Sequence, residues 1–465
     1  MTFHAFTQLG WTDGTHGIWR DRKLVPPRTG SQLDFWIDFA RTAERGLFDS
    51  VFFADAMGMG GSAPGDETPE IRDGRLILWD PSVTISALAA ATRDIGFLFT
   101  SSILQDHPFS FARRVSTLDE FTGGRVGWNI VTSYSPNAAR NFGLADLPDR
   151  EERYRWADEY AEAAYRLWEG SWADDAVVDD AAAATYVDPA LVRTVDVNGE
   201  RYRIRGPHLT PPTPQRTPVL VQAGGSPAGR SFAAKHAEMQ FMALAHEAKM
   251  AADIAAVREL AVGHGRRAED IDFIVSVGFV VGSTEQEARR KADRLDDAAD
   301  DRDLLAYLGS EVGVDLTGIG LDDPLPDLVA GSANAGMSGV RDAILSTLPA
   351  DRVPTVRDVI RNARNRNRIV GTPEQIADRL QALQSLGVGG IAVGESVRPG
   401  SLVDFVDHVI PVLQQRGLAQ REYQPGTLRR KLTGRADRLP ERHPAARHRH
   451  YPPLVRTAAP AAAAQ

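Results

Sequence analysis

The chain of 465 residues contains no cysteine. This absence excludes a disulfide scaffold, a CxxC zinc site, an iron–sulfur cluster and a thiol nucleophile. Long hydrophobic runs are missing as well, because charges such as Arg93-Asp94 interrupt every apolar stretch, and no membrane span is expected. The segment Met1 to Phe6 lacks the basic-then-apolar order of a signal peptide. We therefore expect a cytoplasmic protein.

An excess of positive charge is also absent. The chain has 53 Lys and Arg against 62 Asp and Glu, a formal charge of -9, which argues against nucleic-acid binding as its main function. Hydrophobic residues make up 43% and charged residues 25%, which is ordinary for a globular enzyme with a large core. The length suits about three domains of average size or a single α/β barrel with insertions.

Several catalytic motifs do not occur. There is no GxxxxGK[ST] and no HExxH, so a P-loop nucleotidase and a zinc protease are not expected. The segment Gly224 to Ala228 has Ala where a GxSxG nucleophile elbow needs its last Gly. His443, His448 and His450 lie in an Arg-rich tail, where a solvated charge run is expected rather than a metal site.

What the sequence does have is a regular alternation of short apolar runs and amphipathic segments. The amphipathic segments predict helices at 33–44, 82–92, 111–121 and 153–167, the last with apolar residues at three- and four-residue steps. Eight strands alternating with helices favour a closed (β/α)8 barrel of parallel strands, with a doubly wound open sheet as the alternative. The strands are expected at 3–8, 50–53, 96–101, 126–131, 219–222, 239–242, 273–281 and 390–393.

Three stretches exceed the needs of a minimal barrel. Insertions are expected after the fourth strand, at about 170–218 with a hairpin around Asn198-Gly199, and after the seventh, at about 285–368. We expect one barrel domain over 1–431, followed by a basic tail over 432–465 whose Pro/Ala-rich end is disordered. On an acidic body such a tail is expected to wrap its own subunit or a neighbour, although contact with nucleic acid is an alternative.

Polar residues gather at the carboxyl ends of the predicted strands, which in a barrel converge on one face. Each has an ordinary structural interpretation as a helix cap, a strand residue or a turn former. Together they favour a site for a polar ligand. These residues are Asp55, Thr100, Ser101, Ser102, Asn129, Thr132, Ser133, Tyr134 and the turn Gly224-Gly225-Ser226.

The turn Gly224-Gly225-Ser226 predicts an anion site. Two glycines allow a close backbone approach, and a helix that follows would direct free N–H groups and its positive end at a phosphate. Ser226 can cap that helix, and Pro227 suits its first position. Arg150 and Tyr154, at the start of the helix after the fourth strand, could add a charge and a hydroxyl group.

At these positions the chain resembles the bacterial luciferase-like flavin monooxygenases, in the branch of the nitrilotriacetate, dibenzothiophene-sulfone and long-chain alkane monooxygenases. The resemblance runs in order from about Phe3 to about Lys431. The segments that carry it are 16–20 (HGIWR), 52–55 (FFAD), 112–119 (ARRVSTLD), 124–133 (GRVGWNIVTS), 139–143 (ARNFG), 152–154 (ERY), 167–172 (LWEGSW), 214–218 (PQRTP), 222–224 (QAG), 370–373 (VGTP) and 409–418 (VIPVLQQRGL).

The resemblance implies a (β/α)8 barrel that takes reduced FMN from a separate NAD(P)H-dependent flavin reductase. With O2 it would form a flavin C4a-hydroperoxide and oxygenate a small, largely apolar or xenobiotic organic substrate. Arg150 stands where relatives commonly have His, and a cation is retained for the phosphate. The positions implied to contact FMN are Asp55, Thr100, Asn129, Ser133, Tyr154, Ala223, Gly224, Gly225 and Ser226.

Near the flavin the chain departs from the alkane enzyme, with Gly10, Asp13, Tyr134 and Ala306 where polar or imidazole groups are expected, so alkane hydroxylation is in doubt. His16 and Tyr134 are the candidate catalytic residues, and no metal is expected. The alternatives are an F420-dependent hydride-transferring oxidoreductase of the same barrel superfamily and a flavin-binding protein without turnover. We expect a homodimer or homotetramer with no nucleic-acid or membrane partner.

Overall fold

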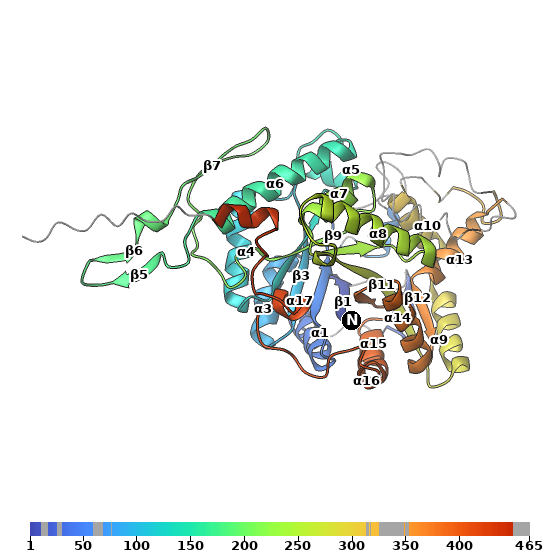
Figure 1. Cartoon of the computed structure of the whole chain (residues 1–465). Coiled ribbons are helices and arrows are strands. Elements are labelled where there is room, and N and C mark those ends of the chain that lie inside the picture. Colours follow the sequence, from blue (N-terminus) through green and yellow to red (C-terminus); the bar gives the residue numbers. More distant parts are fainter. Residues whose placement is uncertain are drawn as a thin grey trace, which may run out of the picture.

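The computed structural model contains a barrel from which one hairpin arm projects (Figure 1). It describes residues 1–10, 17–25, 30–58, 68–75, 77–312, 316, 318–324, 348 and 353–449. His16 and Asp13, named above as candidates near the flavin, lie outside these ranges.

Eight parallel strands form the barrel. They follow one another in space in chain order, and the pairing of β10 with β11 and of β13 with β1 closes the ring. The predicted closed barrel is therefore confirmed, and the open-sheet alternative is wrong. The strands, each within one residue of the predicted run at either end, are β1 Thr2–Gln8, β2 Ser50–Ala54, β3 Gly96–Ser102, β4 Val126–Val131, β9 Val219–Gln222, β10 Met239–Met242, β11 Asp272–Val281 and β13 Gly390–Gly394.

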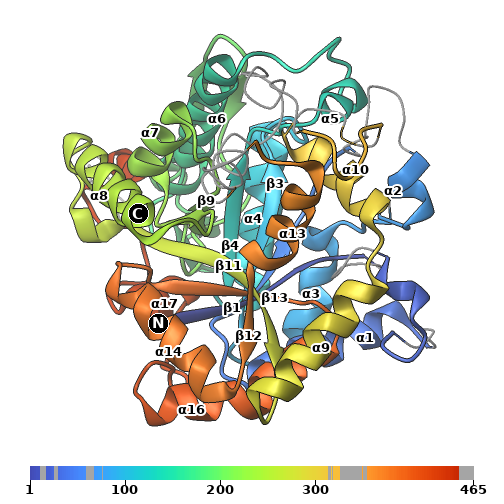
Figure 2. The same cartoon turned by 90° about the vertical axis from the view of Figure 1, so that its right-hand side faces the viewer.

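Helices surround the barrel strands (Figure 2). Several of these helices begin at an N-cap residue. The Ser31 side chain accepts a hydrogen bond from a backbone amide at the start of α1, and the Asp80 side chain does the same at the start of α3. The helix predicted from its apolar periodicity, α6, buries Ala157, Ala161 and Trp168. The helices are α1 Gln32–Arg45, α3 Pro81–Ala91, α4 Pro108–Thr122, α6 Arg150–Gly170, α7 Pro227–His236, α8 Glu247–Gly263 and α14 Pro373–Ser385.

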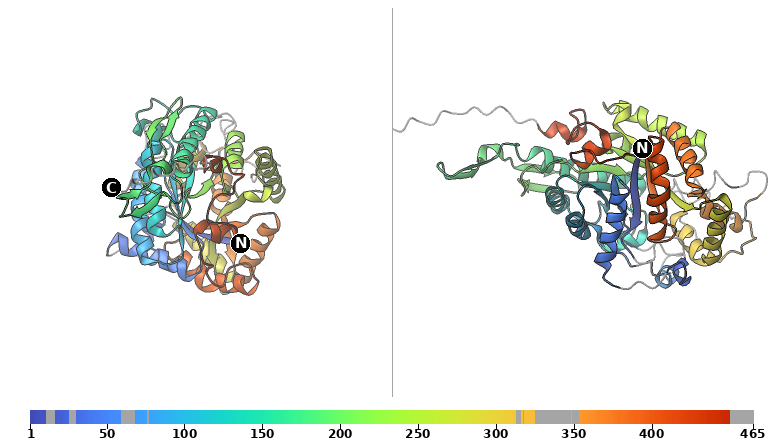
Figure 3. Two further views of the ribbon diagram at one scale, coloured as in Figure 1. Left: turned by 60° about the vertical axis from the view of Figure 1, so that its left-hand side comes forward. Right: turned by 90° about the horizontal axis from the view of Figure 1, so that it is seen from below.

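The first insertion contains two hairpins. The one predicted around Asn198-Gly199 is present as β7 Val195–Asn198 and β8 Arg203–Gly206. A second hairpin, β5 Val177–Asp180 with β6 Thr185–Val187, was not predicted and extends away from the barrel (Figure 3).

The second insertion and the connections add shorter elements. β12 pairs with the end of β11 outside the ring and was not predicted. The remaining elements are β12 Arg368–Gly371, α2 Thr68–Arg72, α5 Pro136–Asn141, α9 Glu285–Ala298, α10 Asp301–Val312, α13 Val356–Arg366, α15 Gly400–Asp404, the π-helical turn Phe405–Val409, α16 Ile410–Gln415, α17 Leu428–Thr433 and the 3-10 turns Ile18–Arg20, Pro189–Leu191, Ala268–Asp270 and Pro444–Arg449.

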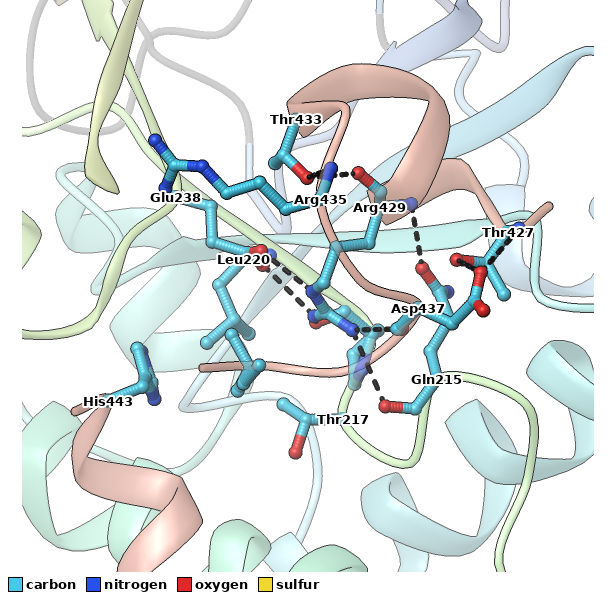
Figure 4. Close-up of polar contacts among 12 residues, drawn as sticks. Gln215, Thr217, Leu220, Glu238, Thr427, Arg429, Thr433, Arg435, Asp437 and His443 are labelled. Carbon is cyan, nitrogen blue, oxygen red and sulfur yellow. Dashed lines mark hydrogen bonds and ion pairs between the residues drawn. The ribbon is translucent and has the colours of Figure 1, made fainter. Parts of the chain in front are cut away.

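The C-terminal segment from α17 onward packs on its own subunit as far as it is described. Leu428 belongs to the apolar cluster inside the barrel, at the amino-terminal ends of the strands. Arg429 is fully buried and binds both carboxylate oxygens of Glu238 at 2.7 and 3.0 Å, as well as the carbonyl oxygen of Gln215 (Figure 4). The turn at 444–449 packs on α6, with an ion pair from Arg449 to a carboxylate of that helix. This C-terminal segment therefore closes the end of the barrel opposite to the carboxyl ends of the strands.

Among the described helices, none combines the length and the apolar character needed to cross a bilayer.

Candidate active site

A cavity of about 480 Å³ lies at the carboxyl ends of the barrel strands. Its wall includes residues that follow or end β2, β3, β4, β9 and β10. Below it the barrel interior is filled by apolar side chains such as Phe52, Leu98 and Ile274. The volume is typical of a pocket for one small ligand or cofactor.

The structure brings most of the predicted site residues to this wall. Asn129 is not on the wall: it is buried next to it, and its amide donates a 2.9 Å hydrogen bond to the Thr100 hydroxyl. The predicted residues on the wall are Asp55, Thr100, Ser133, Tyr134, Arg150, Tyr154, Ala223, Gly224, Gly225 and Ser226.

The glycine turn after β9 has the predicted local structure. Ser226 is buried and caps α7, where its hydroxyl accepts a 3.1 Å hydrogen bond from the amide of Gly229. Tyr154 crosses from α6 to this turn, and its hydroxyl accepts a 3.0 Å hydrogen bond from the Gln222 amide. The turn thus presents the start of α7, with its positive helix end, to the cavity.

Two arginines at the start of α6 face the cavity without a carboxylate. Arg150 has no hydrogen bond or ion pair with any described residue, and Arg153 donates only to the backbone carbonyl of Ser133. A second basic pair, Arg230 and Lys249, shares Asp253 at 3.0 and 2.7 Å and is partly neutralised. The described wall therefore carries a positive excess, which suits a phosphate dianion.

Asp55 is an acidic residue on the same cavity wall, and its carboxyl group is largely shielded from water. Burial raises its pKa from 3.8 to about 7, and the nearby Asp80 adds to the rise, while a 2.9 Å hydrogen bond from the amide of Ala56 opposes it. Near neutral pH the Asp55 carboxyl group is therefore present in both protonation states. It can donate or accept a proton in a hydrogen bond to a ligand.

Buried amide oxygens add unmet hydrogen-bonding capacity around the cavity. Within the described ranges, Asn129 Oδ1, Gln222 Oε1 and Gln240 Oε1 have no hydrogen-bond partner. Gln240 donates instead to the carbonyl oxygen of Gly224 at 3.0 Å. Buried acceptors of this kind are expected to pair with a ligand or with water.

Sequence reasoning missed Arg153, Gln222 and Gln240, which all line the cavity. Ser102 and Thr132, predicted among the polar residues at the strand ends, line it as well. The signal for Gln240 was present, because a single polar residue interrupts the apolar strand Met239–Met242. No comparable signal marked Arg153, since a charged residue in a helix ordinarily faces solvent. No cluster of potential metal ligands occurs in the described part of the chain.

Comparison with known proteins agrees with this geometry. Residues 16–390 match the family model described as luciferase-like monooxygenase. This chain belongs to the luciferase-like monooxygenases. The family identification explains why the polar wall lies at the carboxyl ends of the strands, where barrel enzymes build their sites.

Two relatives of this luciferase-like monooxygenase are equally similar in sequence. The long-chain alkane monooxygenase of Geobacillus thermodenitrificans is 36% identical over 438 residues, 94% of each chain. The dimethyl-sulfide monooxygenase of Hyphomicrobium sulfonivorans is 36% identical over 458 residues, 97% of this chain and 94% of the relative. The predicted branch of the family is confirmed.

A solved structure extends the comparison to the cofactor. Riboflavin lyase, determined with a modified FMN and riboflavin, superposes with a TM-score of 0.85 at 32% identity and covers 97% of this chain and 100% of its own. One structural neighbour of this luciferase-like monooxygenase therefore holds a flavin, and the named relatives differ in their substrates.

Proposed function

We propose that the protein is a two-component monooxygenase that binds reduced FMN and uses O2 to oxygenate a small, largely apolar or xenobiotic organic molecule. One observation carries the proposal: a single cavity joins a positively charged, glycine-lined end to a buried carboxyl group whose pKa is about 7. The positively charged, glycine-lined end suits the phosphate of FMN. The Asp55 carboxyl group can donate or accept a hydrogen bond, which suits the polar edge of the flavin ring.

The charged end of the cavity fits the FMN phosphate. Arg150 would supply a free guanidinium group, Ser226 a hydroxyl proton, and the start of α7 its free amides. Gly224 lets the backbone pass close to the ligand, and Tyr154 fixes the turn through its hydroxyl group. Ala223 and Gly225 complete this end of the wall.

The other end fits the ribityl chain and the ring. Hydroxyl groups are offered by Ser133 and by Thr100, which Asn129 holds from behind through a hydrogen bond. Asp55 offers a carboxyl group that can donate or accept a hydrogen bond. Tyr134 is the candidate catalytic residue on this wall, and His16 is the second candidate, outside the described residues. When bound, the reduced flavin supplies the oxygen chemistry, and the chain binds and orients it.

The substrate would occupy the less polar part of the same cavity. Phe6, Phe241, Met242 and Ala245 lie on its wall and offer no charge. Such a lining favours an uncharged substrate and limits the entry of water around the flavin. Dimethyl sulfide and alkanes, named for the two relatives above, belong to this chemical class.

Reducing equivalents would come from a separate flavin reductase. One curated relative, 32% identical over 428 residues, is named as component A of nitrilotriacetate monooxygenase, a name that implies a second component. We propose a transient meeting with an NAD(P)H-dependent reductase in the cytoplasm, and a homodimer or homotetramer as the assembly.

A coupled assay tests the function. The protein is incubated with a flavin reductase, NADH, FMN and isotopically labelled O2, and dimethyl sulfide, sulfones and alkanes are offered in turn. Incorporation of one labelled oxygen atom into a substrate, dependent on the protein and on FMN, is the expected result. Binding of F420 but not of reduced FMN in equilibrium dialysis would overturn the proposal, and so would tight binding of oxidised FMN without any turnover.

A further inference from the structure

Arg153 is a buried cation without an anionic partner. The residue has a relative exposure of only 3%, although its side chain reaches the cavity wall from the first turn of α6. Its Nη1 donates to the carbonyl oxygen of Ser133, and its buried Nε has no partner among the described residues. No described carboxylate lies within ion-pair distance of the guanidinium group. A buried charge is ordinarily paired, so this one calls for a ligand.

The surroundings of Arg153 make its uncompensated charge more unfavourable. Burial lowers its pKa and the positive charge of Arg150 lowers it further, while Tyr154 and the Asp149 carboxylate oppose the shift without reversing it. The two cations therefore repel each other across the same end of the cavity. Tyr154, the next residue along α6, touches the glycine turn before α7. An anion bound between the start of α6 and the start of α7 would relieve the repulsion and compensate both charges.

The other partner of Arg153 is a residue in an unusual conformation. Ser133 has a φ of 63°, in the left-handed region that residues with a side chain seldom adopt. It lies two residues beyond the end of β4, and its hydroxyl group lies 2.9 Å from that of Ser102 at the end of β3. Both serines line the cavity, so the conformation of Ser133 sets the position of this hydroxyl pair.

We infer that Arg153 is a positioning residue that binds the cofactor phosphate with its free guanidinium edge and holds the Ser133 peptide with the other. Phosphate binding then stabilises the left-handed Ser133 and the Ser102–Ser133 hydroxyl pair, so the two ends of the cavity are coupled. This inference rests on the proposed function, because it takes the ligand to be a flavin phosphate.

The first part of the inference, that Arg153 binds the phosphate, is tested by comparing the binding of reduced FMN with that of reduced riboflavin, which lacks the phosphate. Anaerobic titration of the wild-type protein should show tighter binding of FMN. In Arg153→Gln the preference for FMN over riboflavin should fall about tenfold or more, the effect of losing one hydrogen bond to a charged group. Arg153→Lys keeps the charge but not both hydrogen bonds, and should retain part of the preference.

The second part of the inference, that the two ends of the cavity are coupled, is tested by adding inorganic phosphate to the titration with reduced riboflavin. If the two ends are linked, free phosphate should raise the affinity of the wild-type protein for reduced riboflavin, and it should have no such effect on Arg153→Gln. Arg155→Gln is the matched control, because Arg155 lies in the same helix, pairs with Glu152 and is 65% exposed at its side chain. This control should behave like the wild type in both titrations.

The outcomes separate the inference from the proposed function. If the wild-type protein binds neither flavin, the proposed function fails. If it binds both and Arg153→Gln weakens them equally, Arg153 has only a structural role and the inference is wrong. If Arg153→Gln does not fold, the phosphate titration of the wild type and of Arg153→Lys still decides: no effect of phosphate on riboflavin binding overturns the coupling.

Discussion

The hydroxyl oxygen of Tyr154 occupies the space that a side chain on Gly224 would need. A β-carbon on Gly224 would overlap this oxygen, and one on the neighbouring Gly229 would approach it to 2.7 Å. The same hydroxyl accepts a 3.0 Å hydrogen bond from Gln222. The start of α6 and the turn before α7 are therefore fitted together through one phenol group and two glycines.

Gly224→Ala should weaken the binding of reduced FMN about tenfold or more, because Tyr154 must move away from the turn and the phosphate site widens. Anaerobic titration measures the affinity. In a Tyr154→Phe background the clash is smaller, so the additional effect of Gly224→Ala should shrink in a double-mutant cycle. Gly263→Ala is the control, because nothing lies within 4 Å of a β-carbon at Gly263. Equal losses in the two glycine variants would contradict the prediction.

Ser226→Ala should lower both stability and cofactor affinity. Loss of the cap on α7 costs about 1 kcal/mol of unfolding free energy. Loss of a hydrogen bond to a charged phosphate costs about 1.5–3 kcal/mol, hence roughly ten- to hundred-fold in the affinity for reduced FMN. Ser31→Ala removes the corresponding cap from α1, and should lower stability alone. An unchanged affinity in Ser226→Ala would place the phosphate elsewhere.

Much of the fold could be predicted because the strands of a parallel barrel are buried on both faces and appear as continuous apolar runs. Runs such as Val126–Val131 and Val219–Gln222 coincide with strands. β12 was missed because its four residues begin with an arginine and pair outside the ring. The β5–β6 hairpin was missed because β5 is exposed throughout and half acidic, and because the three residues of β6 are too few to show a pattern.

The site could be predicted only in part. Residues at strand ends are recognisable because the topology brings those ends together, and this found Asp55, Thr100 and Ser133. Arg153 lies in a helix, is buried, and donates a hydrogen bond to Ser133 after β4, a tertiary contact that its own sequence neighbourhood does not encode. The placement of Asn129 behind Thr100 depends on the register of β3 with β4, which a single strand cannot reveal.

Arg429→Met should lower the free energy of unfolding by about 3–5 kcal/mol, because it leaves the Glu238 carboxylate buried without its partner. Arg430→Met is the control, since Arg430 pairs at 3.5 Å with Asp437 and both side chains are exposed, so that about 0–1 kcal/mol is expected. Equilibrium denaturation measures both. Adding Glu238→Gln to Arg429→Met should recover part of the loss, and a double variant no more stable than the single one would contradict this account.

Asp55→Asn should change how stability depends on pH, because burial raises the pKa of Asp55 from 3.8 to about 7 on folding. Below pH 3.8 the carboxyl group is protonated in both states and does not affect stability. Between 3.8 and about 7 the unfolded chain releases the proton while the folded protein keeps it, so stability falls as the pH rises. Above about 7 the penalty no longer grows.

The difference in unfolding free energy between Asp55→Asn and the wild type should therefore increase in favour of the variant from pH 3.8 to about 7 and then level off. Denaturant titrations of the flavin-free proteins at intervals across this range measure the difference, and other titrating groups cancel because both proteins contain them. Asp146→Asn, at an exposed carboxylate that does not line the cavity, is the control for the chemical substitution itself. A constant difference for Asp55→Asn would mean that Asp55 remains ionised in the folded protein, and its role as a carboxyl group able to donate a hydrogen bond to the flavin would have to be abandoned.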